Sequence, residues 1–170
     1  MIILVPFSTV SPELLEWVRI QLSSAIGSEV ELGDLAPLPA KGYNPSRKQY
    51  AGDAILNILN SLPYPASSRV IGLIDVDCYA GGLNFIFGQA MVNGKAAFVA
   101  LPRLKQTFYD LPENQELYRE RVLKEVVHEL GHTWGLAHCT DPVCVMHFSN
   151  SLRDTDIKGV QFCSRCRHKL

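Results

Sequence analysis

Five residues between positions 128 and 138 constrain this chain most, because their spacing requires a helix that ends in a sharp reversal. His128 and His132 are four positions apart, so on a helix both imidazoles project from the same side. Glu129 follows the first histidine and is rotated away from it around the helix axis. Gly135 adopts the left-handed conformation freely, so a helix ends there at little cost. A reversal at this point brings His138 back toward the two helical histidines.

Three converging imidazoles form a ligand set for zinc. They fill three of four tetrahedral positions and leave one for water, which is the arrangement of a catalytic ion. Zinc lowers the pKa of such a water to about 7 and polarises a carbonyl oxygen. We therefore predict a zinc-dependent hydrolase, with His128, His132 and His138 as ligands of the catalytic zinc. Glu129 is the predicted general base, and the predicted reaction is peptide-bond hydrolysis by attack of a zinc-activated water.

Four of the five cysteines lie in the last 35 residues and form two close pairs. Cys139 and Cys144 are separated by four residues, and Cys163 and Cys166 by two, which is the spacing of a four-thiolate zinc site. Four thiolates leave no position for water, so we predict a structural zinc here and two zinc ions per chain. Four free thiols are the alternative. The fifth cysteine, Cys78, follows an apolar strand and is interpreted as a buried thiol.

The composition favours no partner besides a peptide or protein substrate. The 170 residues include 16 basic and 17 acidic side chains, a formal net charge of −1, so neither nucleic acid nor a membrane surface is expected as a partner.

The first residues of the chain do not resemble a signal peptide. Residues 1–7 lack the positive leading segment of a signal peptide, and Pro6 interrupts them. We therefore expect a cytoplasmic protein. In a reducing compartment, the cysteines are expected to bind metal rather than to form disulfides.

The apolar pattern predicts an α/β (α+β) fold with a mixed sheet. Strands are expected over residues 2–6, 29–32, 69–76, 85–90 and 96–101, and helices over residues 12–26, 46–62 and about 110–134. Ser11 is expected to cap the first helix, and Asp110 with Glu113 the third. We expect one domain over residues 1–170. Residues 1–138 would form the sheet and the histidine-bearing helix, and residues 139–170 a small zinc-stabilised subdomain too poor in apolar residues to fold alone.

The segment from residue 128 to residue 166 resembles a known family. His128 to His138 match the extended zinc-binding motif of the metzincin metalloproteases, and Met146 stands where their Met-turn methionine would be. With the two cysteine pairs, the segment looks like the archaemetzincins in particular. The resemblance implies a metallopeptidase with an active-site helix above a cleft and a Met-turn as hydrophobic floor under the zinc. Phe148 departs from the pattern, because several metzincins have a tyrosine at this position as a switchable zinc ligand.

A zinc-stabilised binding module with little or no hydrolytic activity is the competing interpretation. In it, the cysteine pairs and the basic tail over residues 165–169 would contact nucleic acid or a partner protein. The tail has too few cationic groups for strong phosphate binding, and such a module has no use for Glu129. We therefore favour the peptidase, and we interpret residues 85–90 as an edge strand that pairs with extended substrate.

Overall fold

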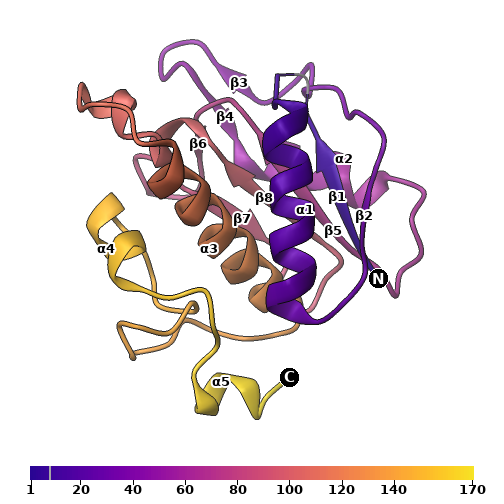
Figure 1. Cartoon of the computed structure of the whole chain (residues 1–170). Helices are drawn as coiled ribbons and strands as arrows, with labels where there is room; N and C mark the ends of the chain where they lie inside the picture. The colour runs from indigo at the N-terminus through magenta and orange to yellow at the C-terminus, as the bar shows by residue number, and fades with distance from the viewer. Residues whose placement is uncertain (8) are drawn as a thin grey trace.

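A five-stranded sheet forms the centre of the molecule in a computed structural model that describes residues 1–7 and 9–170 (Figure 1). Its strand order is β2-β1-β5-β8-β7. The strands are β1 (Ile2–Pro6), β2 (Val30–Leu32), β5 (Arg69–Ile74), β7 (Gly88–Ala90) and β8 (Ala96–Ala100). The pairs from β2 to β8 are parallel, whereas β7 runs antiparallel to β8 and forms one edge. The predicted mixed sheet is therefore confirmed.

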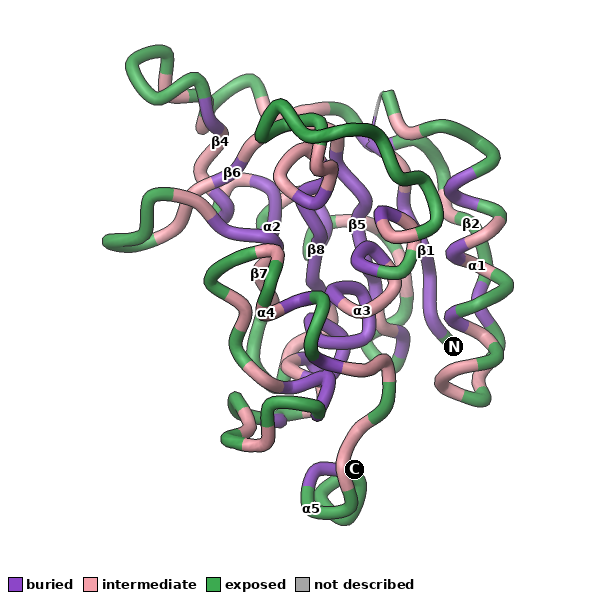
Figure 2. The backbone as a smooth tube through the Cα atoms, turned by 60° about the vertical axis from the view of Figure 1, so that its left-hand side comes forward, coloured by how far each residue is buried: buried purple, intermediate pink, exposed green. Residues whose placement is uncertain are grey.

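Helices cover both faces of this sheet. The helices α1 (Pro12–Ile26) and α3 (Gln115–Thr133) lie side by side on one face, and α2 (Gly52–Ser61) covers the other. Alternate residues of β1 pack on opposite faces of the sheet, because successive side chains of a strand point to opposite sides. Ile2 and Leu4 pack with α1 and α3, and Ile3 and Val5 pack with α2. Figure 2 shows the buried central strands between more exposed outer segments.

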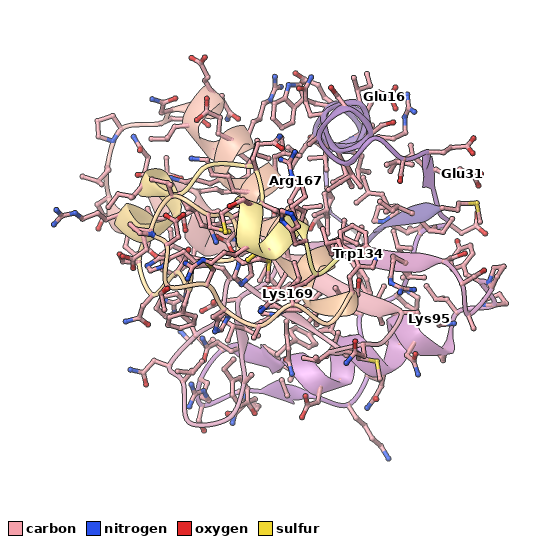
Figure 3. The ribbon with its side chains drawn as sticks, turned by 90° about the horizontal axis from the view of Figure 1, so that it is seen from below. Glu16, Glu31, Lys95, Trp134, Arg167 and Lys169 are labelled. Carbon is pink, nitrogen blue, oxygen red and sulfur yellow. The ribbon has the colours of Figure 1, made fainter. Side chains whose placement is uncertain are left out.

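The remaining elements are short. A second sheet has the order β3-β4-β6 and consists of β3 (Tyr43–Asn44), β4 (Gln49–Ala51) and β6 (Cys78–Tyr79). The other helices are η1 (Pro102–Leu104), η2 (Gln106–Tyr109), α4 (Leu152–Ile157) and α5 (Ser164–Arg167). Figure 3 shows Arg167 and Lys169 on the same side of the molecule as Trp134 at the end of α3. Among the described residues, no helix combines the length and the apolar character that a membrane span needs.

The predicted start of the second helix at residue 46 was wrong. Residues 49–51 form β4 instead, and the helix begins at Gly52. The Tyr50 N–H donates to the carbonyl oxygen of Asp77, and the Gln49 side-chain amide donates to the Asp77 carboxylate at 3.0 Å. Lys48 turns the chain with a φ of 55°. These contacts to a segment some 28 positions away outweigh the local helical pattern.

The helix caps were predicted with mixed success. Ser11 caps α1 as expected, because its hydroxyl oxygen accepts a hydrogen bond from the Leu14 N–H at 3.2 Å. The predicted cap of the third helix at Asp110 was wrong. Asp110 ends η2 with a φ of 57°, and the Asn114 side chain caps α3 by accepting from the Leu117 N–H at 3.0 Å. The predicted strand over residues 85–90 is shorter than expected, since β7 covers Gly88–Ala90.

Candidate functional site

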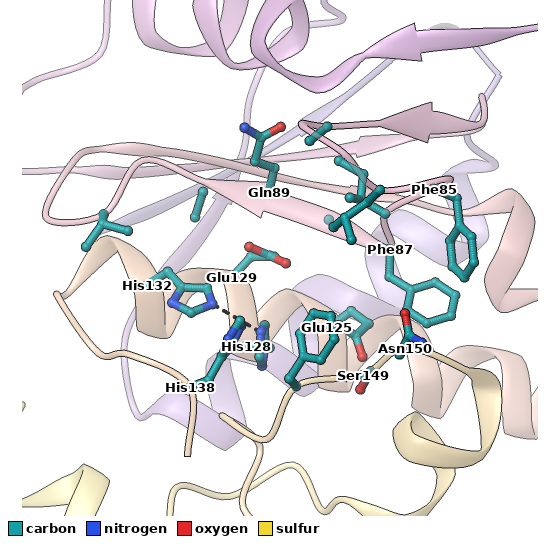
Figure 4. Close-up of a pocket in the computed structure, with 17 residues that line it drawn as sticks. Phe85, Phe87, Gln89, Glu125, His128, Glu129, His132, His138, Ser149 and Asn150 are labelled. Carbon is teal, nitrogen blue, oxygen red and sulfur yellow. Dashed lines mark hydrogen bonds between the residues drawn. The ribbon is translucent and has the colours of Figure 1, made fainter. Parts of the chain in front are cut away.

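The three predicted histidines converge at the C-terminal end of α3 (Figure 4). Their candidate ligand nitrogens all lie within 4.8 Å of one another, and the Nε2 atoms of His128 and His132 are 3.1 Å apart. The helix stops after Thr133, and Gly135 adopts a φ of 89°, which is the left-handed reversal expected from the sequence. This reversal returns His138 to the helix end.

The hydrogen bonds of His128 and His132 show which ring nitrogen of each keeps a lone pair for a metal ion. Nδ1 of His128 lies 2.8 Å from the Val145 carbonyl oxygen, and Nδ1 of His132 lies 2.7 Å from the Leu136 carbonyl oxygen. A carbonyl only accepts, so each Nδ1 carries a proton and each Nε2 of the neutral ring keeps a lone pair. Burial lowers the pKa of both histidines and of His138, which favours the neutral rings. Lone pairs this close repel unless a cation lies between them, so the donor set fits a metal ion.

Glu129 lies beside the histidine cluster, between α3 and the edge strand β7 (Figure 4). The residue is 5% exposed, and burial raises the pKa of its carboxyl well above the usual value, with a further rise from Glu125 and a partial offset by Lys158. Gly88 on β7 leaves room for this side chain. A Cβ atom at position 88 would lie 2.6 Å from Oε1 of Glu129.

A cavity of about 320 Å³ opens along β7 in front of the histidines and Glu129, and it is called the cleft below. Three aromatic residues contribute to its apolar walls, namely Phe85, Phe87 and Phe148. The ring centroid of Phe148 is 5.0 Å from that of His138. Phe148 has no hydroxyl group, so the side chain at this position adds an apolar surface and no ligand.

Met146 packs against the turn of α3 that lies between the two helical histidines. Its side chain is fully buried, and a Cβ atom on Gly131 would lie 2.3 Å from its sulfur atom. The backbone around it is also fixed, because the Met146 carbonyl oxygen accepts from the Cys139 N–H at 2.9 Å. This arrangement agrees with the hydrophobic floor that the resemblance to metzincins implies.

The four predicted cysteines form a second cluster. Their sulfur atoms all lie within 4.8 Å of one another, and none of these four cysteines forms a disulfide. Cys139 and Cys163 are 3.8 Å apart, as are Cys144 and Cys166. The Cys166 backbone N–H contributes most to lowering the pKa of the Cys163 thiol to about 6, which favours a thiolate. Four converging sulfur donors fit a closed tetrahedral zinc site.

Cys78 is buried, as predicted. It is 0% exposed in β6, and burial raises the pKa of its thiol to about 12. Its sulfur donates weakly to the Val76 carbonyl oxygen at 3.6 Å. An inert thiol of this kind has no part in either cluster.

Two buried charged residues beside the site were not predicted. Glu125 lines the cleft, and its Oε1 lies 2.9 Å from Nζ of Lys158, which is 1% exposed. Glu125 could have been predicted from the sequence, because it precedes Glu129 by four residues and therefore lies on the same face of the helix. Lys158 lies 30 positions beyond His128, and no local pattern indicates that it returns to the site.

Comparisons with known proteins agree with this geometry. The model of Peptidase family M54 matches residues 39–170. The archaemetzincin of Methanocaldococcus jannaschii is 40% identical over 165 residues, which are 97% of this chain and 89% of that protein. The crystal structure of the Archaeoglobus fulgidus archaemetzincin complexed with malonate has a TM-score of 0.85 at 38% identity, with 100% of both chains covered. A zinc-dependent peptidase from Methanocorpusculum labreanum has a TM-score of 0.88 at 27% identity, with 99% of both chains covered.

The matches extend over nearly the whole chain and join it to proteins of one kind. The zinc cofactors that were predicted, one catalytic and one structural, agree with this family and with the two clusters of possible metal ligands, one of three histidines and one of four cysteines. The predicted resemblance and the predicted hydrolase class are both confirmed. The chain belongs to peptidase family M54, the archaemetzincins, and is a zinc metallopeptidase that acts on peptide substrates.

Proposed function

We propose that His128, His132 and His138 hold the catalytic zinc and that Glu129 is the general base of peptide hydrolysis. One observation carries this assignment: the Nε2 atoms of the buried His128 and the half-buried His132 lie 3.1 Å apart, and backbone carbonyls hold both rings in that orientation. The carboxylate of Glu129 stands beside this cluster in the same cleft.

The side chains around the cleft divide the work of the reaction. Zinc, when bound, polarises the scissile carbonyl and makes water more acidic. Glu129 accepts the proton of the attacking water at its carboxylate and passes it to the nitrogen of the leaving amine. Burial suits it to this double role, because a carboxyl with a raised pKa holds a proton more readily than an exposed one. The carbonyl groups of Val145 and Leu136 keep the two helical imidazoles in place.

The edge strand β7 is the proposed binding surface for the peptide backbone. It pairs with β8 along one side, and residues 88–90 line the cleft. An edge strand offers unpaired N–H and carbonyl groups, which an extended peptide can satisfy by adding a strand. The substrate would then lie along β7, with its scissile bond next to Glu129 and the histidines.

Cys139, Cys144, Cys163 and Cys166 are the proposed ligands of the structural zinc. Residues 1–170 form a single catalytic domain in this proposal, and residues 139–170 are its Met-turn and four-cysteine subdomain. The shared core supports a single domain, because Cys144, Met146 and Cys166 pack with residues of the sheet and α3.

The proposed location is the cytoplasm, because four reduced thiols are expected in a reducing compartment. The formal net charge of −1 supports a protein without a nucleic-acid partner.

Metal analysis tests both sets of ligands. Protein purified from zinc-replete cells is expected to hold about two zinc ions per chain, one removed easily by a chelator and one resistant, since one site is open and the other closed. Peptide-library cleavage should disappear with the first zinc and return when zinc is added back. A single zinc per chain would contradict the assignment of the cysteines. Cleavage that survives complete loss of zinc would contradict the assignment of the histidines.

Gly88→Ala is expected to reduce kcat/KM for peptide cleavage by roughly 10²-fold, the scale reported when catalytic groups are misplaced by about 1 Å. The new Cβ atom would lie 2.6 Å from Oε1 of Glu129 and equally close to the Phe98 carbonyl oxygen, so the base or the edge strand must move. Gly82→Ala is the control, because a Cβ atom there meets nothing within 4 Å. Parent kinetics in Gly88→Ala would show that Glu129 is not confined by β7 as described.

A further inference from the structure

Lys158 is completely buried behind the histidine cluster. Its side chain is 0% exposed, and its Nζ lies 2.9 Å from Oε1 of Glu125 and 3.5 Å from Nδ1 of His128. The His128 Nδ1 donates to the Val145 carbonyl oxygen and has no lone pair left to accept, so the Lys158 ammonium group, which only donates, lies beside the ring without a hydrogen bond to it. Nζ also donates to the His147 carbonyl oxygen at 3.3 Å. Lys158 thus contacts α3 and the segment from Val145 to His147, called the floor segment below.

Glu125 is the anchor that holds Lys158 in this place. Its side chain is 3% exposed, and the same Oε1 that meets Lys158 accepts a hydrogen bond from the Thr155 hydroxyl at 3.2 Å. Glu125 lies on α3, one helical turn before Glu129. The ammonium group therefore connects a rigid helix to the loop that carries Met146.

Fold stability alone does not account for such a pair. Two charges lose their hydration on burial, and this cost offsets much of their attraction, so apolar side chains of similar volume often stabilise a core equally well. An apolar residue at position 158 would leave the His147 carbonyl oxygen without this donor. The specific contribution of the lysine is to tie the floor segment to α3.

We propose that Lys158, anchored by Glu125, is a positioning residue for the catalytic zinc: it holds the floor segment against α3, so that the Val145 carbonyl keeps the Nε2 of His128 directed at the metal. The inference rests on the proposed role of His128 as a zinc ligand. A carbonyl that orients the ring of a ligand histidine affects metal affinity strongly, typically by 10–100-fold when such support is removed.

A second ion pair provides a matched control. Arg121 lies on α3, four residues before Glu125, and forms a two-pronged ion pair with Asp156 of α4 at 2.6 and 2.8 Å. It also donates to the Leu104 carbonyl oxygen, but its hydrogen bonds do not reach the floor segment. This pair joins α4 to α3 and includes neither Lys158 nor Glu125 nor a residue of the floor segment.

The test compares two double variants that leave no unpaired charge. Lys158→Met with Glu125→Gln removes the proposed positioning pair, and Arg121→Met with Asp156→Asn removes the control pair. The affinity of the easily chelated zinc is measured by chelator competition on protein shown to be folded by circular dichroism, and kcat and KM are measured with zinc in excess. We expect the first variant to bind this zinc 10–100-fold more weakly and to lose kcat with little change in KM. The control variant is expected to keep the zinc affinity and the kcat of the parent.

Two results would overturn the proposal. The first is parent zinc affinity and parent kcat in the folded Lys158 and Glu125 double variant. The second is an equal loss in both double variants, which would assign the effect to the docking of α4. Should the first double variant not fold, Glu125→Asp keeps both charges and withdraws the carboxylate from Lys158, and unchanged zinc affinity there would also overturn the proposal. His128→Ala tests the underlying ligand assignment separately, because unchanged affinity in that variant contradicts the proposed function itself.

Discussion

Glu129→Gln is expected to keep both zinc ions and to hydrolyse peptides about 10²–10⁴-fold more slowly than the parent, the loss typical of a positioned acid–base group. Glutamine has nearly the same shape, but its amide does not accept a proton from water at neutral pH. Glu129 is buried beside the histidines, and the proposed metal ligands are the three histidines without it. The substitution should therefore separate catalysis from metal binding.

The measurement combines kcat, KM and zinc content for the variant and a matched control. Glu120→Gln is the control, because Glu120 lies on the same helix and is exposed to solvent. We expect the loss in Glu129→Gln to fall on kcat, since the base acts in the transition state rather than in substrate binding. A Glu129→Gln enzyme that cleaves as fast as the parent would mean that another group takes the proton.

The histidine and cysteine clusters could be predicted because most of their information is local. The geometry of one helical turn places His128 beside His132, and one glycine with positive φ reverses the chain toward His138. The cysteines come in two pairs, each within a few residues, so only one long-range contact was needed to complete the second cluster.

The features that escaped prediction depend on contacts between distant residues. The strand β4 forms because its residues meet Asp77, which lies 28 positions beyond Gln49. Lys158 reaches the site from beyond α4, and its position is explained by the buried carboxylate of Glu125 rather than by any neighbour in the sequence. The closeness of Gly88 to Glu129 likewise requires β7 to pack next to α3. A single sequence indicates which side chains are suited to chemistry, and it leaves open which distant side chains hold them.

Cys163→Ser with Cys166→Ser is expected to abolish the structural zinc and also to weaken the catalytic zinc, by roughly the 10–100-fold typical of lost support around a ligand. The two clusters are joined through adjacent residues, because His138 belongs to one and Cys139 to the other. The Cys139 N–H donates to the Met146 carbonyl oxygen at 2.9 Å. The Cys139 carbonyl oxygen lies 3.0 Å from Nδ1 of His147.

The cysteine cluster is also connected to His128, the first of the proposed zinc ligands. Cys144 directly precedes Val145, and the Val145 carbonyl oxygen accepts from Nδ1 of His128. Gln161, which lies close to the second cysteine pair in the sequence, accepts a backbone hydrogen bond from the Val145 N–H at 3.0 Å. With two thiolates removed, the closed tetrahedral site is lost, and both connections to the catalytic cluster are free to move.

Chelator competition on the parent and on the double variant measures this coupling directly. Cys78→Ser is the matched control, because it exchanges the same atoms at a buried thiol that lies outside both clusters. We expect parent affinity for the catalytic zinc in the control and weaker affinity in the double variant, with circular dichroism confirming that all three proteins are folded. Equal affinities in the folded parent and double variant would show that the two sites are independent. The four-cysteine subdomain would then stabilise the C-terminal segment without supporting the catalytic zinc.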